Sequence, residues 1–220
     1  PDFTAPIPAL LTTVQGASIT TPELWEKTRR PELLDTFHQH VYGRTPIGRP
    51  AGLRFEAAAP DQTMMAGKAL RKQINIVFQG PGGTGTIHVV AFIPKQQKPA
   101  PAFLLICNRL PEKNIDPERR ERSPFWPAEE IVDRGYAAIA FWNGDVAPDK
   151  PNMHHAGVHG LFQPDVRQRK PDSWGTLAAW AWGRQPHHGL DRKRTVTRRK
   201  TRCHHRPLTR RKNRTLVRRQ

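Results

Sequence analysis

Residues 126–145, "WPAEEIVDRGYAAIAFWNGD", decide the fold class of this chain. The second part, 136–142, is a continuous apolar run, as a strand buried on both faces requires. The first part predicts a short helix, because Pro127 stands at its start, acidic residues follow at once, and Gly135 comes after its end. A second apolar run, "AFLLIC" at 102–107, precedes this helix. Strand, helix and strand form a βαβ unit, so the sequence predicts an α/β protein with a mostly parallel sheet flanked by helices.

Upstream of this unit, two segments alternate between apolar and polar residues. They are "KALRKQINIVF" at 68–78 and "TIHVVAFIP" at 86–94, and "QGPGGTG" at 79–85 joins them. Such alternation predicts two half-buried strands, so we expect an antiparallel hairpin. The glycine-rich segment also invites interpretation as a phosphate loop. It lacks the Lys-Ser/Thr pair of such loops and does not open a helix, so a hairpin turn is the better interpretation.

The chain begins with a Pro- and Thr-rich lead-in at residues 1–21, which we expect to be extended. Residues 22–43 then predict one or two helices, with Thr21 and Pro22 forming the cap and first turn and Pro31 suiting a second start. Gly43 is the expected end of this segment. Four apolar residues share one face of it: Leu33, Leu34, Phe37 and Val41.

The segment 172–183, "DSWGTLAAWAWG", predicts the start of another helix. Asp172 or Ser173 is the expected cap, and the helix should continue past Gly183. Four residues are expected to face inward: Trp174, Leu177, Ala178 and Ala181.

Positive charge is concentrated at the end of the chain. The formal net charge is +17, and residues 184–220 hold 12 Arg and 3 Lys against one acid, Asp191, which is 15 − 1 = +14. The remaining residues carry only 17 − 14 = +3 and have an ordinary globular composition. We therefore divide the chain into an extended lead-in (1–21), a partial α/β domain (22–183) and a basic tail (184–220).

The two cysteines argue against a disulfide-stabilised protein, and the hydropathy argues against a membrane-spanning one. Cys107 lies in an apolar run and Cys203 in the basic tail, so a structural disulfide is not expected. No apolar run is long enough to span a membrane. The sequence begins at Pro1 without a Met, so a signal peptide is not visible in it.

The stretch 123–149, followed by "GV" at 157–158 and by 172–183, resembles the glucuronoyl-esterase-like branch of the α/β-hydrolases. These carbohydrate esterases are often described as acetyl-xylan-esterase-like. The resemblance covers roughly residues 22–183. It implies the first part of an α/β-hydrolase fold and a serine ester hydrolase acting on glucuronoyl or acetyl esters of plant cell-wall carbohydrate. It also implies a Ser-His-acid triad, no metal or organic cofactor, and a secreted or periplasmic location.

The same resemblance calls for a nucleophile elbow of the form G-x-S-R-x-G-K after the next helix and strand, and no such motif occurs in the 220 residues. If the tail codons are read one base later, "RPLTRRKNRTLVRR" (206–219) permits GHSRGGKTALWCGA. The preceding "KTRCHH" (200–205) permits KRVVII, an apolar strand. We therefore hypothesise that the tail is the active-site region translated out of frame from near Gly183. The chain as printed then has no catalytic residue and is expected to be inactive and incompletely folded.

Polar and aromatic side chains follow the two buried strands. In open α/β sheets the ligand crevice lies beyond the carboxyl ends of the strands, so these residues are candidates for lining a substrate pocket or shaping the oxyanion region. Asp145 is in the wrong order to be the triad acid, which follows the nucleophile in this fold. The candidates are Asn108, Arg109, Trp142, Asn143 and Asp145.

Two further features of the sequence suggest zinc binding and nucleic-acid binding. His154, His155 and His159 have a spacing that could ligate zinc on a helix, but Gly157 weakens a helix there and no fourth ligand lies nearby. A polar loop over the active-site face is the better interpretation. The alternative for the whole chain is an α/β scaffold whose cationic arm binds nucleic acid, since Lys and Arg clusters neutralise phosphates. The tail has no aromatic residue for base stacking, so we expect only incidental, non-specific polyanion binding.

Overall fold

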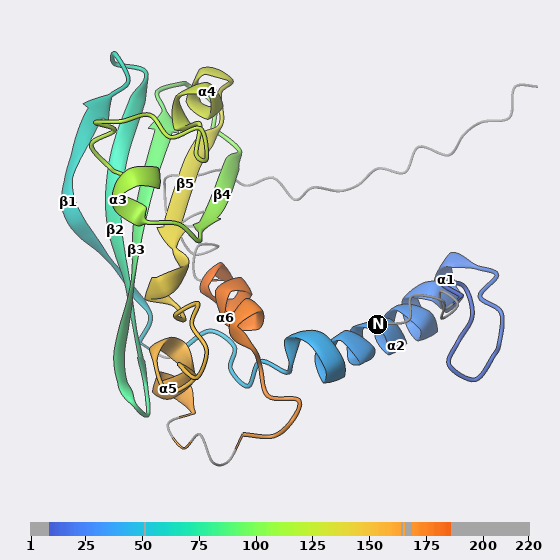
Figure 1. Cartoon of the computed structure of the whole chain (residues 1–220). Helices are drawn as coiled ribbons and strands as arrows, with labels where there is room; N and C mark the ends of the chain where they lie inside the picture. Colours follow the sequence, from blue (N-terminus) through green and yellow to red (C-terminus); the bar gives the residue numbers. More distant parts are fainter. Residues whose placement is uncertain (1–8, 51, 164, 166–168, 186–220) are drawn as a thin grey trace, which may run out of the picture.

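The computed structural model describes residues 9–50, 52–163, 165 and 169–185. Five strands form one mixed sheet, and helices lie beside it (Figure 1). In the described part of the chain, no helix is both long enough and apolar enough to cross a membrane. The strands are β1 (Arg54–Met64), β2 (Ala69–Gly80), β3 (Gly83–Pro94), β4 (Ala102–Cys107) and β5 (Ala137–Trp142). The helical elements are α1 (Pro22–Leu24), η1 (Trp25–Arg29), α2 (Arg30–Phe37), η2 (His38–Tyr42), α3 (Pro111–Asn114), α4 (Ala128–Asp133), η3 (Asn143–Asp145), α5 (Gly157–Phe162) and α6 (Thr176–Gly183).

The predicted βαβ unit is confirmed. Strands β4 and β5 pair in parallel, and α4 connects them. Pro127 is the residue before the first turn of α4, and Glu129 and Glu130 lie in that turn, where carboxylates interact favourably with the helix dipole. The α/β class and the parallel β4–β5 pair are therefore as predicted. The sheet is mixed and not mostly parallel, because its other three strand pairs, β1–β2, β2–β3 and β3–β5, are antiparallel.

The predicted hairpin is also confirmed. Strands β2 and β3 pair antiparallel along their whole length, down to Gly80 opposite Gly83, with a two-residue turn between them. Strand β3 pairs antiparallel with β5 and so joins the hairpin to the βαβ unit. The strand order is β1-β2-β3-β5-β4, which places β1 and β4 at the two edges of the sheet.

Strand β1 was not predicted from the sequence. It pairs antiparallel with β2, and the pairing shifts register twice, between Ala57 and Ala59 and between Ala59 and Gln62. Pro60 and the charged residues in the segment interrupt the alternation that marks a strand. The strand is recognised only from its pairing with β2.

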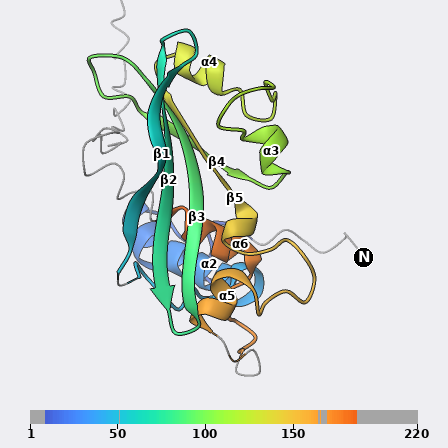
Figure 2. The ribbon, with the colours of Figure 1, turned by 90° about the vertical axis from the view of Figure 1, so that its left-hand side faces the viewer.

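Each face of the sheet carries its own apolar cluster. Val89 of β3 belongs to the cluster that includes Trp174 and Trp182, on the side of α5 and α6. Its neighbour Val90 belongs to the cluster that includes Trp126, on the side of α4. This division follows the period-2 alternation of a strand. In Figures 1 and 2, α3 and α4 lie toward one end of the sheet and α5 and α6 toward the other.

Residues 22–42 form one continuous helical rod, which extends away from the sheet (Figure 1). As predicted, Thr21 caps it, since the Thr21 hydroxyl accepts a hydrogen bond from the Leu24 N–H at 3.2 Å. Pro31 does not start a separate helix. It lies within the rod, just after the π-helical turn η1, which accommodates the missing N–H of the proline. The rod ends at Gly43, whose φ of +76° and contact with the Ser173 backbone exclude a side chain there.

The buried face and the cap of helix α6 differ in part from the prediction. Trp174 is fully buried as predicted, but Leu177 and Ala181 are exposed, and the buried residues of the helix are Ala179, Trp182 and Gly183. The cap position is Gly175, not Asp172 or Ser173.

The basic tail lies almost entirely outside the described residues. The structure describes no residue after 185. It therefore tests neither the out-of-frame hypothesis nor the cationic arm, and Cys203 lies outside the described residues. Residues 1–8 of the predicted extended lead-in are likewise outside the description. Residues 9–21 are described and are not extended throughout, since they form turns and an antiparallel bridge between Thr12 and Ser18.

Candidate functional site

The carboxyl ends of β4 and β5 lie next to each other. Cys107, the last residue of β4, pairs with Trp142, the last residue of β5. Asn108 and Arg109 therefore leave the sheet at the same end as the turn η3. This is the edge at which an open α/β sheet forms its ligand crevice.

Asp145 holds this end of β5 to the neighbouring strand β3. Its carboxylate Oδ2 accepts a hydrogen bond from the backbone N–H of His88 at 2.9 Å and lies 3.1 Å from His88 Nδ1. The Asp145 side chain is largely buried, whereas the imidazole of His88 is mostly exposed. With Nδ1 held by the carboxylate, the ring orientation of His88 is fixed, and Nε2 is the nitrogen left to meet a ligand.

Sequence reasoning missed His88. It is one polar position in the alternation of β3, with no motif around it. Only the pairing of β3 with β5 brings it to Asp145, more than fifty residues away. The strand register is therefore the one signal that could have found it.

A cavity of about 400 Å³ opens beside this pair. Trp142, Asp145 and His88 line one side of it. The segment after β4 lines the other side with carboxylates, and β2 contributes two amides. The polar groups from these two sources are Gln73, Asn75, Glu112, Asp116, Glu118 and Arg120. An exposed indole together with many hydrogen-bonding groups suits a hydroxyl-rich ligand better than an apolar one.

Ion pairs fix the segment that covers the cavity. Asp116 accepts hydrogen bonds from the Arg120 side chain at 3.0 Å and from the Glu118 N–H at 3.0 Å. Burial opposes ionisation of Asp116, but these hydrogen bonds outweigh it and lower the pKa of its carboxyl. Glu118 in turn pairs with Arg71, which is buried on β2. The wall of the cavity is thus tied to the sheet.

The turn η3 is built so that Trp142 can lie over it. A Cβ on Gly144 would overlap the indole of Trp142. The neighbouring Asn143 is buried, and its carbonyl oxygen accepts hydrogen bonds from the N–H groups of Val146 and Ala147 at 3.0 and 2.9 Å. The side-chain amide nitrogen of Asn143 has no hydrogen-bond partner among the described residues. Asn143 therefore supports the turn and does not line the cavity.

Asn108 and Arg109 lie apart from the cavity. Both are exposed, and the guanidinium of Arg109 lies over the ring of Phe125, 4.1 Å from its centre. The five candidates thus share one end of the sheet, but only Trp142 and Asp145 line the cavity.

The histidines at 154–159 do not form the predicted polar loop throughout. His159 lies on α5 and is only 2% exposed, so that part of the prediction is wrong. Its ring contacts Trp174 and His154, and neither of its nitrogens has a hydrogen-bond partner in the described structure. Burial, together with the nearby Arg169 and His154, lowers the pKa of His159 to about 4. Among the described residues, no three His, Cys, Asp or Glu side chains are placed to hold a metal ion.

Comparisons with known proteins show relatives in sequence and in fold. No family model matches the chain. A carbohydrate esterase from an unknown prokaryotic organism is 24% identical in an alignment 211 residues long, which covers 83% of this chain and 48% of that protein. The solved structure of a glucuronoyl esterase from Solibacter usitatus superposes with a TM-score of 0.74 at 27% identity, covering 88% of this chain and 55% of that one. A CE15 glucuronoyl esterase from Teredinibacter turnerae gives a TM-score of 0.71 at 25% identity, covering 87% and 48%.

The predicted resemblance and fold are thereby confirmed. The chain spans about half the length of the relatives it matches.

Proposed function

We propose that this chain, a glucuronoyl-esterase-like carbohydrate esterase in fold and sequence, forms the first part of a serine hydrolase that cleaves esters of plant cell-wall carbohydrate. The observation that carries the proposal is the likeness to the Solibacter usitatus glucuronoyl esterase across 88% of the chain. The scissile ester is a glucuronoyl or an acetyl ester. The enzyme acts outside the cytoplasm, in a secreted or periplasmic setting, where such polymers are met.

The described residues bind and orient the sugar in this proposal. The face of a sugar ring packs on the exposed indole of Trp142, and its hydroxyls donate to the carboxylates and amides across the 400 Å³ cavity. Asp145, whose acceptor oxygen is already occupied by His88, keeps His88 oriented so that Nε2 can bond a hydroxyl. Asn108 and Arg109 follow β4 at the end of the sheet where the ester carbonyl is expected, and we assign to their backbone N–H groups a part in holding the oxyanion.

The reaction itself needs a nucleophile that the printed sequence does not contain. No nucleophile elbow of the G-x-S-x-G form occurs in the 220 residues. A serine attacks the ester carbonyl, a histidine takes its proton, and the alcohol leaves with a proton from that histidine. Water, deprotonated by the same histidine, then attacks the acyl-serine, which releases the acid and returns the proton to the serine. Without the serine, triad-dependent catalysis is lost almost entirely. We propose that this chain, as printed, is inactive for that reason.

The test uses two ester substrates and the coding DNA. The printed chain is incubated with a chromogenic acetate and with a glucuronate methyl ester, and the hydrolysis of both is expected to match buffer. A rate far above buffer contradicts the proposed inactivity. A DNA read across the codon for Gly183 is expected to reveal a reading frame with a serine elbow. If no frame encodes one, the out-of-frame origin of the tail is wrong.

A further inference from the structure

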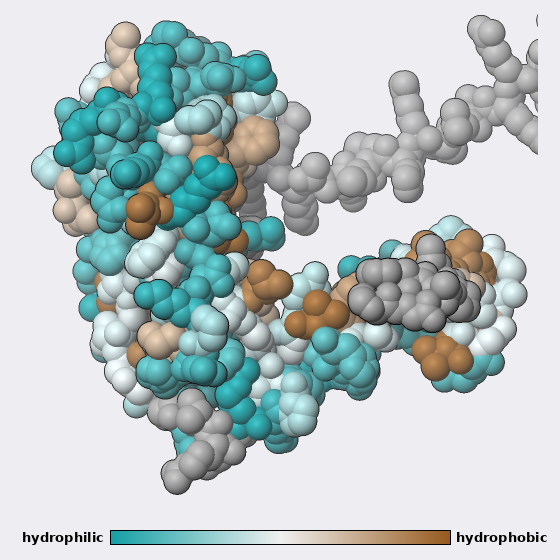
Figure 3. All heavy atoms as spheres, viewed as in Figure 1, coloured by the Kyte–Doolittle hydropathy of each residue, from teal (hydrophilic) through white to brown (hydrophobic). Residues whose placement is uncertain are grey.

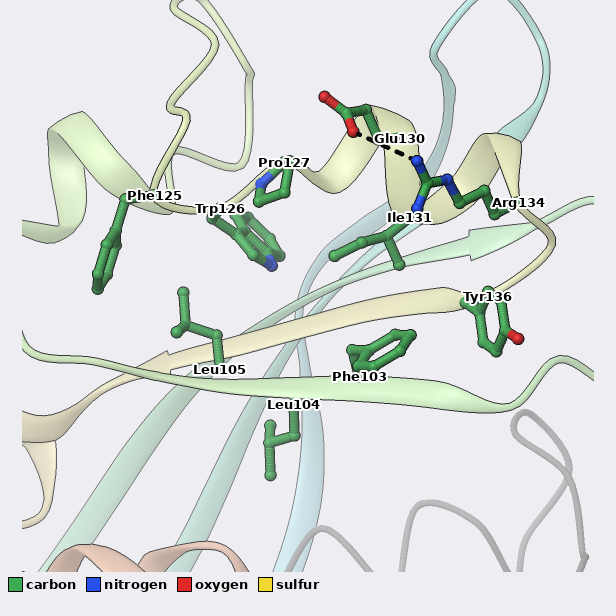
Figure 4. A pocket seen from close by; sticks show the side chains of 10 residues that line it. All are labelled: Phe103, Leu104, Leu105, Phe125, Trp126, Pro127, Glu130, Ile131, Arg134 and Tyr136. Atoms are coloured by element: carbon green, nitrogen blue, oxygen red, sulfur yellow. Dashed lines mark ion pairs between the residues drawn. The ribbon is translucent and has the colours of Figure 1, made fainter.

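Two hollows in the described part of the chain differ in charge. The groove between β4 and α4 has a volume of about 550 Å³ and is mostly apolar (Figure 4). Its two charged residues, Glu130 and Arg134, form an ion pair with each other at 4.0 Å. Hydrophilic residues predominate over the upper part of the body, where α3 and α4 lie (Figure 3). The cavity of about 400 Å³ beside Trp142 is lined by four carboxylates: Glu112, Asp116, Glu118 and Asp145.

Guanidinium groups neutralise two of these carboxylates. Asp116 lies 3.0 Å from Nε of Arg120, which lines the same cavity. Glu118 pairs with Arg71, which is buried on β2. Each pair brings one positive and one negative charge to the cavity wall. Together the two pairs hold the segment around α3 against the sheet and add no net charge.

The other two carboxylates have no cationic partner. Among the described residues, no Lys or Arg lies within ion-pair distance of Asp145 or Glu112. Asp145 contacts His88, and at pH 8 a histidine is ordinarily neutral. The Asp145 side chain is only 12% exposed, so water and salt screen its charge less than that of a surface carboxylate. The cavity therefore keeps two uncompensated negative charges, one of them largely buried.

The neutral groups of the cavity also suit a ligand that donates hydrogen bonds. Asn75 of β2 and His88 of β3 stand directly opposite each other, and both line the cavity. The Asn75 Oδ1 atom is buried and has no hydrogen-bond partner among the described residues. A sugar hydroxyl can donate to this oxygen, whereas a carboxylate has no proton to donate. Hydrogen bonding and charge therefore favour the same kind of ligand.

We propose that this cavity selects sugars by charge: it binds uncharged sugar residues, an esterified uronate included, and repels a sugar that carries a free carboxylate. The proposal rests on the proposed function, which gives the cavity a sugar to bind. Ester hydrolysis consumes water and releases an alcohol, and the new carboxylic acid loses its proton at neutral pH. An uncharged group thus becomes an anion. Because like charges repel, the cavity holds the esterified carbohydrate and favours release of the acid product.

The test compares two ligands with the same sugar ring and different charge. The full chain is titrated at pH 8 with the methyl ester of methyl glucuronoside and with its free acid, and ligand-observed NMR reports the binding of each. The acid is expected to bind about fivefold more weakly than the ester. Raising the salt from about 20 mM to about 500 mM should narrow this difference, because salt screens charge and leaves shape unchanged. Trp142→Ala should weaken binding of the ester, which places the ligand in this cavity.

A pair of variants assigns the effect to the cavity carboxylates. Glu112→Gln removes one uncompensated charge and keeps the shape of the side chain, so the difference between acid and ester should fall about twofold. Glu130→Gln makes the same change in the groove between β4 and α4 and should leave the difference as it is. Both glutamates are exposed, so both variants are expected to keep the circular dichroism spectrum of the parent chain.

Equal affinity for the two ligands, or tighter binding of the acid, overturns the charge selection and leaves the proposed hydrolysis standing. A difference that persists at high salt and in Glu112→Gln shows selection by shape and overturns it as well. If neither ligand binds, the charge selection and the sugar-binding role of the cavity are both wrong. The ester hydrolysis itself is tested separately, by the activity of the polypeptide from the shifted reading frame.

Discussion

His159 offers the sharpest prediction about stability. It is buried beside Trp174 with both ring nitrogens unpartnered among the described residues, and its pKa is about 4 against an ordinary value of 6.5. Because the folded pKa is depressed, the unfolded chain binds the proton between pH 6.5 and 4 while the folded chain does not. Stability is therefore retained above pH 6.5 and lost as the pH falls toward 4. The difference between an ordinary pKa of 6.5 and a folded pKa of about 4 corresponds to about 3 kcal/mol.

The perturbation is His159→Leu, which keeps a side chain of similar size and removes both nitrogens. Urea unfolding is followed by tryptophan fluorescence from pH 8 to 4, and the difference between variant and parent is expected to grow by about 3 kcal/mol in favour of the variant. His155→Leu, at an exposed histidine of the same segment, is the control and should leave the pH dependence unchanged. A parent–variant difference that stays constant across this pH range refutes the reasoning.

Three further predictions concern the site and the tail. Gly144→Ala should reduce the free energy of unfolding by about 1–3 kcal/mol in a urea titration, because the new methyl overlaps the Trp142 ring. The control is Gly48→Ala, at a position with open space, which should change this free energy by less than about 0.5 kcal/mol. Trp142→Ala should weaken the binding of a neutral xylo-oligosaccharide about tenfold in calorimetry, because roughly 1.5 kcal/mol of stacking is lost. Tyr136→Ala, in the groove between β4 and α4, should leave the binding unchanged. Equal effects of the two substitutions contradict the assignment of the sugar to the cavity beside Trp142. In gel shifts, duplex DNA should bind weakly and release steeply between 50 and 200 mM salt whatever its sequence, and sequence-selective binding that survives salt favours an evolved cationic arm.

Local patterns in the sequence account for most of the fold. The continuous runs at 102–107 and 136–142 and the alternation at 68–78 and 86–94 gave the correct strands, because burial on one or both faces imposes those periods directly. Strand β1 escaped because an edge strand does not need a complete apolar face, and Pro60 breaks what pattern it has. Its existence depends on a neighbouring strand and not on its own residues.

The apolar faces of the helices were harder to interpret. Phe37 and Val41 share a face as predicted, yet 47% and 55% of their surfaces are exposed. Leu177 is exposed for the same reason, since helix periodicity marks an apolar face without saying what covers it. Among the described residues, these apolar faces therefore stay uncovered.

The place of the candidate residues in the fold was predicted in part, and their role in binding a substrate stays a prediction. Placing residues after parallel strands correctly brought Trp142 and Asp145 to one end of the sheet, since strand direction alone fixes that end. His88 could not be found in this way, because its approach to Asp145 depends on the register between β3 and β5. The burial of His159 was likewise hidden, since a Gly-flanked histidine in a polar segment gives no sign of a helix.

Ester hydrolysis by the products of the two reading frames tests the central claim most directly. The account predicts that the chain as printed hydrolyses neither a glucuronate methyl ester nor a chromogenic acetate above buffer. It also predicts that the coding DNA, read one base later from near the codon for Gly183, encodes a serine elbow, and that the resulting polypeptide hydrolyses at least one of the two esters. A gene with no such frame, or a shifted polypeptide that leaves both esters intact, contradicts the account.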